Sequence, residues 1–233
     1  MPRFLPSDFL LAAIGTAEDG HSRDNGSMNS TGSVRFFDAQ FRRQAAAKEF
    51  ALNPFEARAL PFIGGSVLDL GCGLGNLAIA AAAQGSRVLA LDASPAGIES
   101  LAARARDLQL EIATRCVDLG DYVPEGQYDS VVAIGLFMFF PCDAARRQLK
   151  RALKAVRPGG TAVVNVLIQG TTYMEMFDSE MGYCLMAEDE LPMAFKGWEV
   201  LDDRVEQFDA AAGTVKRFRT SIARRPISGT RAG

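Results

Sequence analysis

The segment Val67-Leu-Asp-Leu-Gly-Cys-Gly-Leu-Gly75 decides the fold, because an apolar run leads directly into three closely spaced glycines. The apolar run is typical of a buried β-strand, and the glycines predict a tight turn that opens a helix. At such a turn the backbone approaches a ligand closely, and the N–H groups of the helix point at it. We therefore predict a ligand site here, with contacts from the following residues: Asp69, Gly71, Cys72, Gly73 and Asn76.

The glycine spacing and the acid before it limit the kind of ligand. A dinucleotide-binding fingerprint has the spacing G-x-G-x-x-G, and Asn76 stands where its third glycine is required. Asp69, just before the turn, would repel a diphosphate and attract an ammonium or sulfonium group. These features argue against a nicotinamide-dependent dehydrogenase. A protein that binds this ligand without catalysing a reaction stays an alternative, because the sequence specifies a site for a second substrate less well.

From Gly65 onward, short apolar runs alternate with amphipathic stretches. This alternation is typical of parallel strands joined by crossover helices. The predicted strands are Ser66–Leu70, Arg87–Leu91, Glu111–Arg115, Tyr128–Ile134 and Thr161–Leu167, followed by a hairpin of Glu199–Phe208 and Val215–Ala223. The predicted helices between them are Asn76–Gln84, Pro95–Leu108 and Asp143–Val156. The pattern predicts an α/β fold.

A second acid, Asp92, follows the second predicted strand. From this position a carboxylate can accept hydrogen bonds from both hydroxyl groups of a ribose. Ser94 and Pro95 already supply the cap of the following helix, so we expect Asp92 to be free for a ligand, with Ala93 beside it.

A third acid, Asp118, follows the third predicted strand together with Leu119. Open α/β sheets bind ligands at the carboxyl ends of their strands, so Asp118 is a candidate to accept from the amino group of an adenine. The alternative for Asp118 is a turn residue before Gly120. Ile134, at the end of the fourth predicted strand, completes the predicted cofactor site.

Five short motifs lie in order along the chain: Val67–Gly75, Asp92, Asp118–Leu119, Tyr128–Val132 and Arg157–Gly160. In this combination they resemble the class I S-adenosylmethionine-dependent methyltransferases, over most of the chain. The resemblance implies a Rossmann-like three-layer α/β/α sandwich, whose seven-stranded, mostly parallel sheet has an antiparallel last strand. It also implies S-adenosyl-L-methionine as the cofactor, with its methionine part against Gly71 and Gly73, its ribose on Asp92 and its adenine framed by Asp118 and Leu119.

Four motifs carry a narrower resemblance: Asp118-Leu119, Gln127-Tyr-Asp129, Leu136-Phe-Met-Phe-Phe140 and Phe195-Lys-Gly-Trp-Glu199. They are similar to the tellurite-resistance branch of the family, whose members methylate tellurite and selenite. The chain departs from that branch at Gln207-Phe-Asp209, where the branch carries a His-Arg pair. The resemblance implies a small soluble acceptor. A tellurite- or selenite-type oxyanion is one candidate, and O-, S- or N-methylation of a small organic metabolite is the alternative.

The acceptor side of the site is less well defined by the sequence. Methyl transfer from a sulfonium is an in-line displacement that depends chiefly on orientation. The sole histidine, His21, falls in a polar segment, which favours an acceptor that is already anionic. For an oxyanion, the candidate cations are Arg42, Arg43, Arg217 and Arg219. No catalytic residue is predicted, and the predicted acceptor pocket consists of Phe41, Arg43, Phe137, Phe139 and Tyr173.

The length of the chain fits one domain, which we place at residues 63–225. Residues 1–33 have few apolar side chains, which predicts a disordered tail, and Met28 within it suggests a later start of translation. Residues 34–62 predict a cap of two helices, broken at Pro54 and Pro61. Residues 226–233 predict a flexible tail.

Composition and charge exclude several classes of partner. A net charge of -3 argues against nucleic acid, and no segment predicts a signal peptide or a membrane span. The four cysteines lack C-x-x-C spacing, so we expect no metal site and no disulfide framework, with Cys184 as core filler. A cytoplasmic monomer or homodimer is the expected form.

Overall fold

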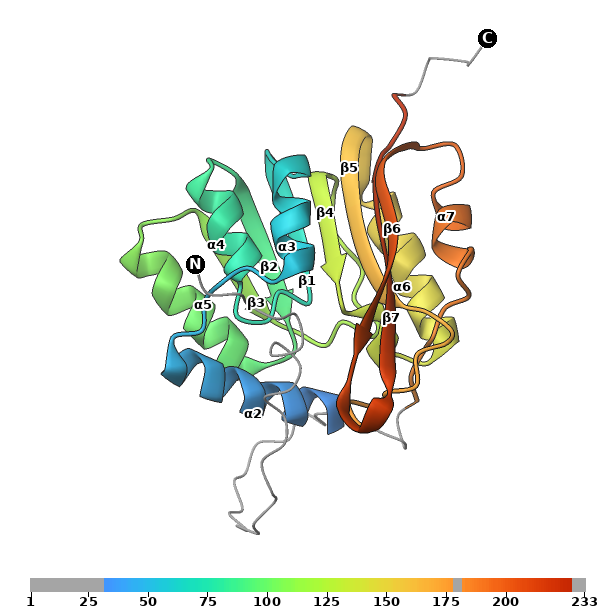
Figure 1. Cartoon of the computed structure of the whole chain (residues 1–233). Helices are drawn as coiled ribbons and strands as arrows, with labels where there is room; N and C mark the ends of the chain where they lie inside the picture. The colour runs from blue at the N-terminus through green and yellow to red at the C-terminus, as the bar shows by residue number, and fades with distance from the viewer. Residues whose placement is uncertain (1–31, 178–181, 228–233) are drawn as a thin grey trace, which may run out of the picture.

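Seven strands form one sheet in the order β3-β2-β1-β4-β5-β7-β6 within the residues that the structure describes, 32–177 and 182–227 (Figure 1). The strands of this computed structural model are β1 Ser66–Leu70, β2 Arg87–Asp92, β3 Ile112–Cys116, β4 Tyr128–Ile134, β5 Val156–Leu167, β6 Glu199–Asp209 and β7 Val215–Arg224. All neighbouring pairs are parallel except those of β7, which runs antiparallel to both β5 and β6. The predicted seven-stranded sheet with its antiparallel last strand is therefore confirmed.

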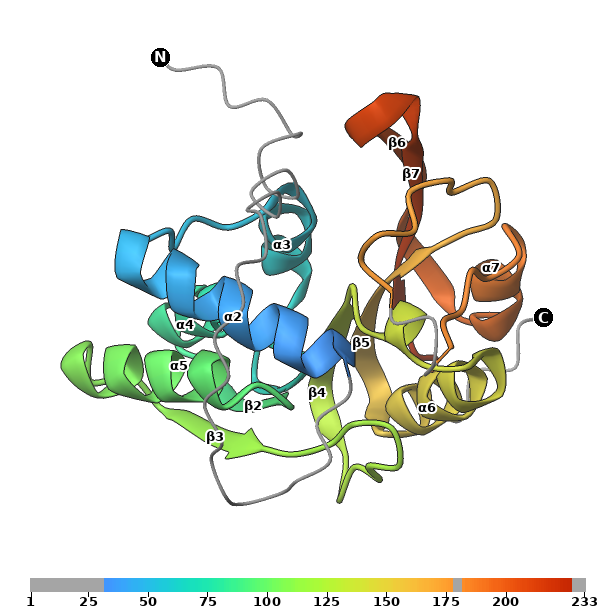
Figure 2. The ribbon, with the colours of Figure 1, turned by 90° about the horizontal axis from the view of Figure 1, so that it is seen from below.

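Helices cover both faces of the sheet (Figures 1 and 2). One face carries α3 Pro54–Ala59, α4 Asn76–Ala83 and α5 Pro95–Asp107, and the other carries α6 Cys142–Lys154 and α7 Glu190–Ala194. Neighbouring residues of β4 turn to opposite faces, so that Val132 packs with Leu77 of α4 and Val131 packs with Leu149 of α6. Because both faces are buried, the central strands are almost continuously apolar. The predicted three-layer α/β/α sandwich is confirmed.

A further helix, α2 Gly32–Ala47, crosses the edge of the sheet at which the parallel strands end (Figures 1 and 2). The Asp38 carboxylate of α2 accepts hydrogen bonds from Ser94 Oγ at 2.7 Å and from the Ala96 N–H at 2.9 Å, at the start of α5. Phe37 of α2 also contacts Phe139, which follows β4, and the centroids of the two rings lie 4.9 Å apart. The helix therefore closes the carboxyl edge of the sheet over the turn that follows β1.

Most predicted elements agree with the structure to within two residues, and the exceptions have local causes. Strand β5 begins at Val156 rather than at Thr161, because Gly159 and Gly160 exchange backbone hydrogen bonds with Arg225 and extend the ladder. The helical cap begins at Gly32, two residues early, and ends in a 3-10 turn at Leu60–Phe62. Helix α7 and the 3-10 turns Phe137–Phe139 and Ala211–Gly213 follow no periodic pattern that would predict them.

The two predicted tails fall mostly outside the described residues. Of residues 1–33 the structure describes only 32 and 33, and of residues 226–233 only 226 and 227, so the hypothesis on Met28 also lies outside the described part. In the part that is described, no helix is both long enough and apolar enough to cross a membrane.

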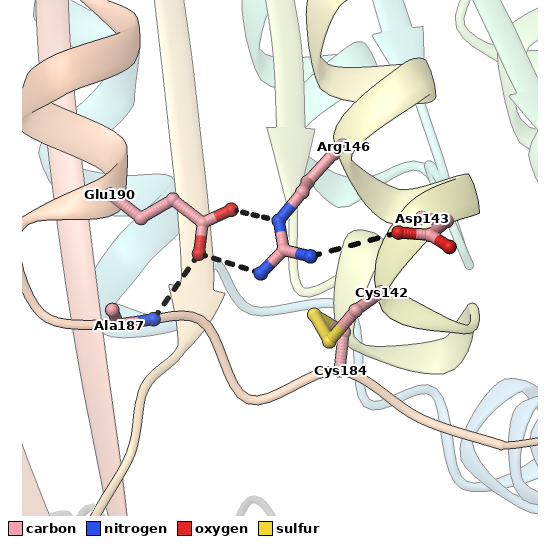
Figure 3. The surroundings of a disulfide bond; sticks show 6 residues. All are labelled: Cys142, Asp143, Arg146, Cys184, Ala187 and Glu190. Atoms are coloured by element: carbon pink, nitrogen blue, oxygen red, sulfur yellow. Dashed lines mark hydrogen bonds and ion pairs between the residues drawn. A yellow bond between two sulfur atoms is a disulfide. The ribbon is translucent and has the colours of Figure 1, made fainter.

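The expectation of no disulfide is wrong, because Cys142 and Cys184 are bonded to one another (Figure 3). Cys142 opens α6, and Cys184 lies on the segment after β5, with a sequence separation of 42 residues that provides no spacing signal. Beside the disulfide, Arg146 of α6 forms an ion pair with Glu190 of α7, with an Nε–Oε1 distance of 2.5 Å (Figure 3). The disulfide and the ion pair therefore both connect α6 to the segment between β5 and β6.

Candidate functional site

The turn after β1 has the backbone that its glycines predict. Gly73 and Gly75 have φ angles of 55° and 71°, in the left-handed region that L side chains rarely adopt. A Cβ atom on Gly73 would lie 2.9 Å from Cζ of Phe41 in α2, and one on Gly75 would lie 2.4 Å from Leu101 in α5. The turn therefore packs directly against two helices, and both contacts require glycine.

Asp92, at the end of β2, holds this turn in place. Its two carboxylate oxygens accept hydrogen bonds from the N–H groups of Gly73 and Ser94, each at 2.8 Å. Ser94 caps α5, since its Oγ accepts from the Gly97 N–H at 3.1 Å, and Pro95 is the first residue of that helix. The predicted cap is confirmed, and Asp92 itself accepts the N–H of the capping residue. Each oxygen retains a second lone pair for a ligand.

Two more carboxylates lie near this turn. Asp69 on β1 is 5% exposed, and burial, followed by the charges of Glu56 and Asp92, raises its pKa to about 8. Glu56 comes from α3, and burial raises its pKa to about 7, although a hydrogen bond from the Asn53 N–H opposes the shift. Like charges that are buried together disfavour one another's ionised form. A cation placed between these side chains would reverse both shifts.

Glu56 is a site residue that the sequence analysis missed. Asn53 Oδ1 accepts hydrogen bonds from the Phe55 and Glu56 N–H groups, each at 2.9 Å, and the Glu56 carboxylate accepts from the Asn53 N–H at 2.8 Å. This capping box is visible in the sequence, but it predicts only where α3 begins. An ion pair between Arg58 and Glu206 of β6 anchors α3 over the sheet, and this tertiary contact directs Glu56 toward β1.

A cavity of about 260 Å³ lies at the turn, with α2 and α3 contributing to its walls. Nine of the predicted cofactor residues line it: Asp69, Gly71, Cys72, Gly73, Asn76, Asp92, Ala93, Leu119 and Ile134. From the predicted acceptor pocket, Phe41 and Phe139 line it. Its acidic lining residues are Glu49, Glu56, Asp69 and Asp92, and the described lining includes no lysine, arginine or histidine. The cavity therefore suits a ligand with positive charge.

The remaining predicted site residues lie outside this lining. Asp118 is exposed, and its carboxylate accepts a hydrogen bond from the Gly120 N–H at 2.8 Å, which is the alternative turn role. Phe137 belongs to the core at 1% exposure, because it points away from the cavity into the cluster beneath α6. Tyr173 is 7% exposed in a neighbouring aromatic cluster, and Arg43 is exposed on α2.

The four arginines that we expected near an oxyanion lie outside the cavity lining. Three of them form ion pairs: Arg42 with Asp38 at 3.0 Å, Arg217 with Glu188 at 2.9 Å, and Arg219 with Asp203 through a hydrogen bond of 3.0 Å. His21 lies outside the described residues. The described residues also contain no group of three His, Cys, Asp or Glu side chains able to hold a metal ion.

Comparison with known proteins agrees with this geometry. Residues 67–160 match a family model described as a methyltransferase domain. The ubiquinone biosynthesis O-methyltransferase of Bradyrhizobium diazoefficiens is 30% identical over 135 residues, which are 54% of this chain and 48% of that protein. The chain spans about half the length of the curated relatives it matches.

Two solved structures share the fold. TehB from Haemophilus influenzae has a TM-score of 0.64 and 20% identity, over 83% of this chain and 67% of that chain. The N-methyltransferase NodS from Bradyrhizobium japonicum, in complex with S-adenosyl-L-homocysteine, has a TM-score of 0.61 and 16% identity, over 82% of this chain and 98% of that chain. These likenesses show the fold alone. The region that matches the methyltransferase-domain model, residues 67–160, includes the glycine turn, Asp92 and Leu119.

Proposed function

We propose that the cavity beside the glycine turn binds S-adenosylmethionine and that the protein transfers a methyl group from it to a small acceptor. The observation that carries the proposal is the acidic wall of the cavity. Glu56, Asp69 and Asp92 line it, and no basic side chain of the described lining balances them. A diphosphate would add to the repulsion among these acids, whereas a sulfonium and an ammonium would relieve it.

The residues of the cavity fit each part of this cofactor. Asp69 and Glu56 would hold the ammonium of the methionine part, since a cation beside them would offset the cost of ionising buried carboxyl groups. Asp92 has lone pairs left for the ribose hydroxyl groups, and Leu119 and Ile134 provide apolar walls for the nucleoside. A contact between the exposed Asp118 and the adenine amino group is part of the same proposal.

The protein's own part in the reaction is orientation and the exclusion of water. When bound, S-adenosylmethionine supplies a methyl group on a positively charged sulfur. Holding an acceptor in line with it can lower the barrier by about 7–11 kcal/mol. Phe37, Phe41 and Phe139 close the cavity under α2, and their ring faces can contact a sulfonium. Because the described lining has no histidine or lysine, we propose an acceptor that ionises readily, such as an oxyanion, a thiolate or a phenolate.

Calorimetry tests the cofactor assignment. We expect S-adenosylhomocysteine to bind with a Kd between roughly 0.1 and 10 μM and NAD not to bind. Asp69→Asn and Glu56→Gln should weaken binding, and Lys150→Gln, at an exposed position of α6, serves as the control. Binding of NAD, or of neither compound, would contradict the proposal. Transfer of radiolabelled methyl to a small molecule in a lysate distinguishes an enzyme from a protein that only senses the cofactor.

We further propose a tellurite- or selenite-type oxyanion as one candidate acceptor, supported by the four motifs of the narrower resemblance. Cells that overproduce the protein and receive the oxyanion should release volatile methylated tellurium or selenium. A headspace equal to that of an empty-vector control would favour small organic O-, S- or N-acceptors instead. A cytoplasmic location belongs to the same proposal. Cys142 and Cys184 recovered from cells as free thiols would support it, and an intact disulfide between them would contradict it.

A further inference from the structure

Helix α2 covers the cavity without belonging to the buried core (Figure 2). The residues of one helical face line the cavity: Ser33, Val34, Phe37, Gln40, Phe41 and Gln44. No residue of α2, from Gly32 to Ala47, is fully buried, whereas α5 and α6 both bury residues in the core. A molecule in the cavity would therefore cover the inner face of α2 and add contacts that hold the helix in place.

The carboxylate of Asp38 holds α2 to the start of α5. Its Oδ1 accepts hydrogen bonds from Ser94 Oγ at 2.7 Å and from the Ala96 N–H at 2.9 Å. A negative charge is favourable at this position, because the first N–H groups of a helix lack partners within the helix. Arg42, which is one turn further along α2, pairs with Oδ2 of Asp38 at 3.0 Å. These contacts are polar and partly exposed, so water can replace them when the helix moves away.

Ser94 connects this contact to the proposed cofactor site. Its Oγ donates to Asp38, and its N–H donates to Oδ1 of Asp92 at 2.8 Å. The Oδ2 atom of Asp92 accepts from the N–H of Gly73, in the glycine turn, at 2.8 Å. Phe41 of α2 lies against the same turn, because a Cβ atom on Gly73 would be 2.9 Å from its ring. The position of α2 and the position of the proposed ribose-binding carboxylate therefore depend on the same short segment.

Helix α2 ends at a backbone position that suits a hinge. Lys48 has a φ angle of 56°, in the left-handed region that a lysine rarely adopts. From Phe50 onward the chain is held to the domain, since Arg104 of α5 lies over the Phe50 ring, 3.8 Å from its centroid. Asn76 of α4 also donates a hydrogen bond from Nδ2 to the carbonyl oxygen of Ala51 at 3.1 Å. Hinges are commonly a few residues at the end of an element, and Lys48 directly precedes this held segment.

We propose that Asp38 is a positioning residue that holds α2 closed as a lid over the bound cofactor, and that the lid opens by movement about Lys48. This inference rests on the proposed function and adds how the cofactor enters and is retained. Phe37 and Phe41 would contact the cofactor only while α2 is closed, so cofactor binding shifts the helix toward the closed position. Through Ser94, the closed helix in turn stabilises the carboxylate that holds the ribose. The lid then sets how fast S-adenosylhomocysteine leaves.

Hydrogen exchange of the full chain tests the movement of the lid. An isolated helix as short as α2 is only marginally stable in water, so its amides should exchange whenever the lid is open. In wild-type protein without ligand, residues 36–47 should therefore exchange faster than α5. S-adenosylhomocysteine at about 100 times its Kd should slow their exchange at least tenfold. Equal exchange of residues 36–47 with and without bound ligand would overturn the proposal.

Asp38→Ala removes the hydrogen bonds to α5 and leaves a good helix former in α2. In surface plasmon resonance, this variant should release S-adenosylhomocysteine at least about tenfold faster than wild-type protein, the scale for loss of a hydrogen bond to a charged group. Asp38→Asn, which keeps a neutral acceptor, should give an intermediate release rate. The matched control is Asp107→Asn, at an exposed position of the other end of α5, which should release the ligand at the wild-type rate.

The release rate separates this proposal from a structural role and from the proposed function. A purely structural role of Asp38 would lower the Tm of Asp38→Ala but leave the release rate of the folded variant unchanged, and that result overturns the proposal alone. Failure of wild-type protein to bind S-adenosylhomocysteine overturns the proposed function, and the lid with it. If Asp38→Ala does not fold, Asp38→Asn provides the comparison with wild-type protein.

Discussion

Binding of S-adenosylmethionine at neutral pH should release protons, because a cation lowers the pKa of the two buried carboxyl groups that face it. In the free protein the pKa of Asp69 is about 8 and that of Glu56 is about 7. At pH 7, roughly nine tenths of Asp69 and roughly half of Glu56 is then protonated. If both ionise in the complex, binding of one cofactor molecule releases roughly 1.4 protons.

The same linkage sets the sign of the pH dependence. As the pH falls, both carboxyl groups take up protons and the attraction for the cation is lost. Affinity for S-adenosylmethionine should weaken by roughly tenfold or more between pH 7 and pH 6 and should level off well above pH 8. S-adenosylhomocysteine keeps the ammonium that these carboxyl groups would hold, so its affinity should show a similar dependence on pH.

Glu56→Gln is the perturbation that tests this reasoning. It removes one titrating group and also the charge that raises the pKa of Asp69, so the variant should release fewer protons at pH 7. Calorimetry in buffers of equal pH but different ionisation enthalpy counts the protons directly. Asp143→Asn, at a side chain that is 91% exposed, should change nothing. Binding without proton release in wild-type protein, or equal release in wild type and Glu56→Gln, would refute the assignment.

The free energy of unfolding should follow the opposite trend in the absence of cofactor. The folded-state pKa values of Asp69 and Glu56 lie above their ordinary values of 3.8 and 4.5. Their contribution to stability is therefore fully present below about pH 4 and is lost as the pH rises toward about 8. Urea titrations across this range should show the loss, and saturating S-adenosylmethionine should oppose it.

Three further predictions concern individual residues. Asp92→Asn should weaken S-adenosylhomocysteine binding by about 1.5–3 kcal/mol in calorimetry, because it replaces a charged acceptor. Gly73→Ala should lower the free energy of unfolding by at least about 1–2 kcal/mol, and Phe41→Leu should recover only the part due to the contact with the Phe41 ring. Reduction of the Cys142–Cys184 disulfide, which spans 42 residues, should cost about 3–4 kcal/mol in urea unfolding without changing cofactor affinity.

The parts of the fold that could be predicted are those that local sequence determines. The bounds of β1 and β4 agree with prediction to the residue, because their apolar runs end sharply at polar residues or glycines. The errors occur where a distant partner decides the structure. The early start of β5 depends on pairing with Arg225, and the disulfide depends on the return of the chain beside α6. Neither partner is recognisable from spacing.

Asp69 and Asp92 could be predicted as site residues, because they lie at the carboxyl ends of strands that meet at one edge of the sheet. Glu56 could not be predicted as a site residue, since the packing of α3 places it there. A sequence shows where charges stand along a chain but not which of them are neutralised. Arg217 and Arg219, which we expected to serve an anion, form ion pairs with Glu188 and Asp203. The burial of like charges beside one another, which only the folded structure reveals, is therefore the stronger guide to this site.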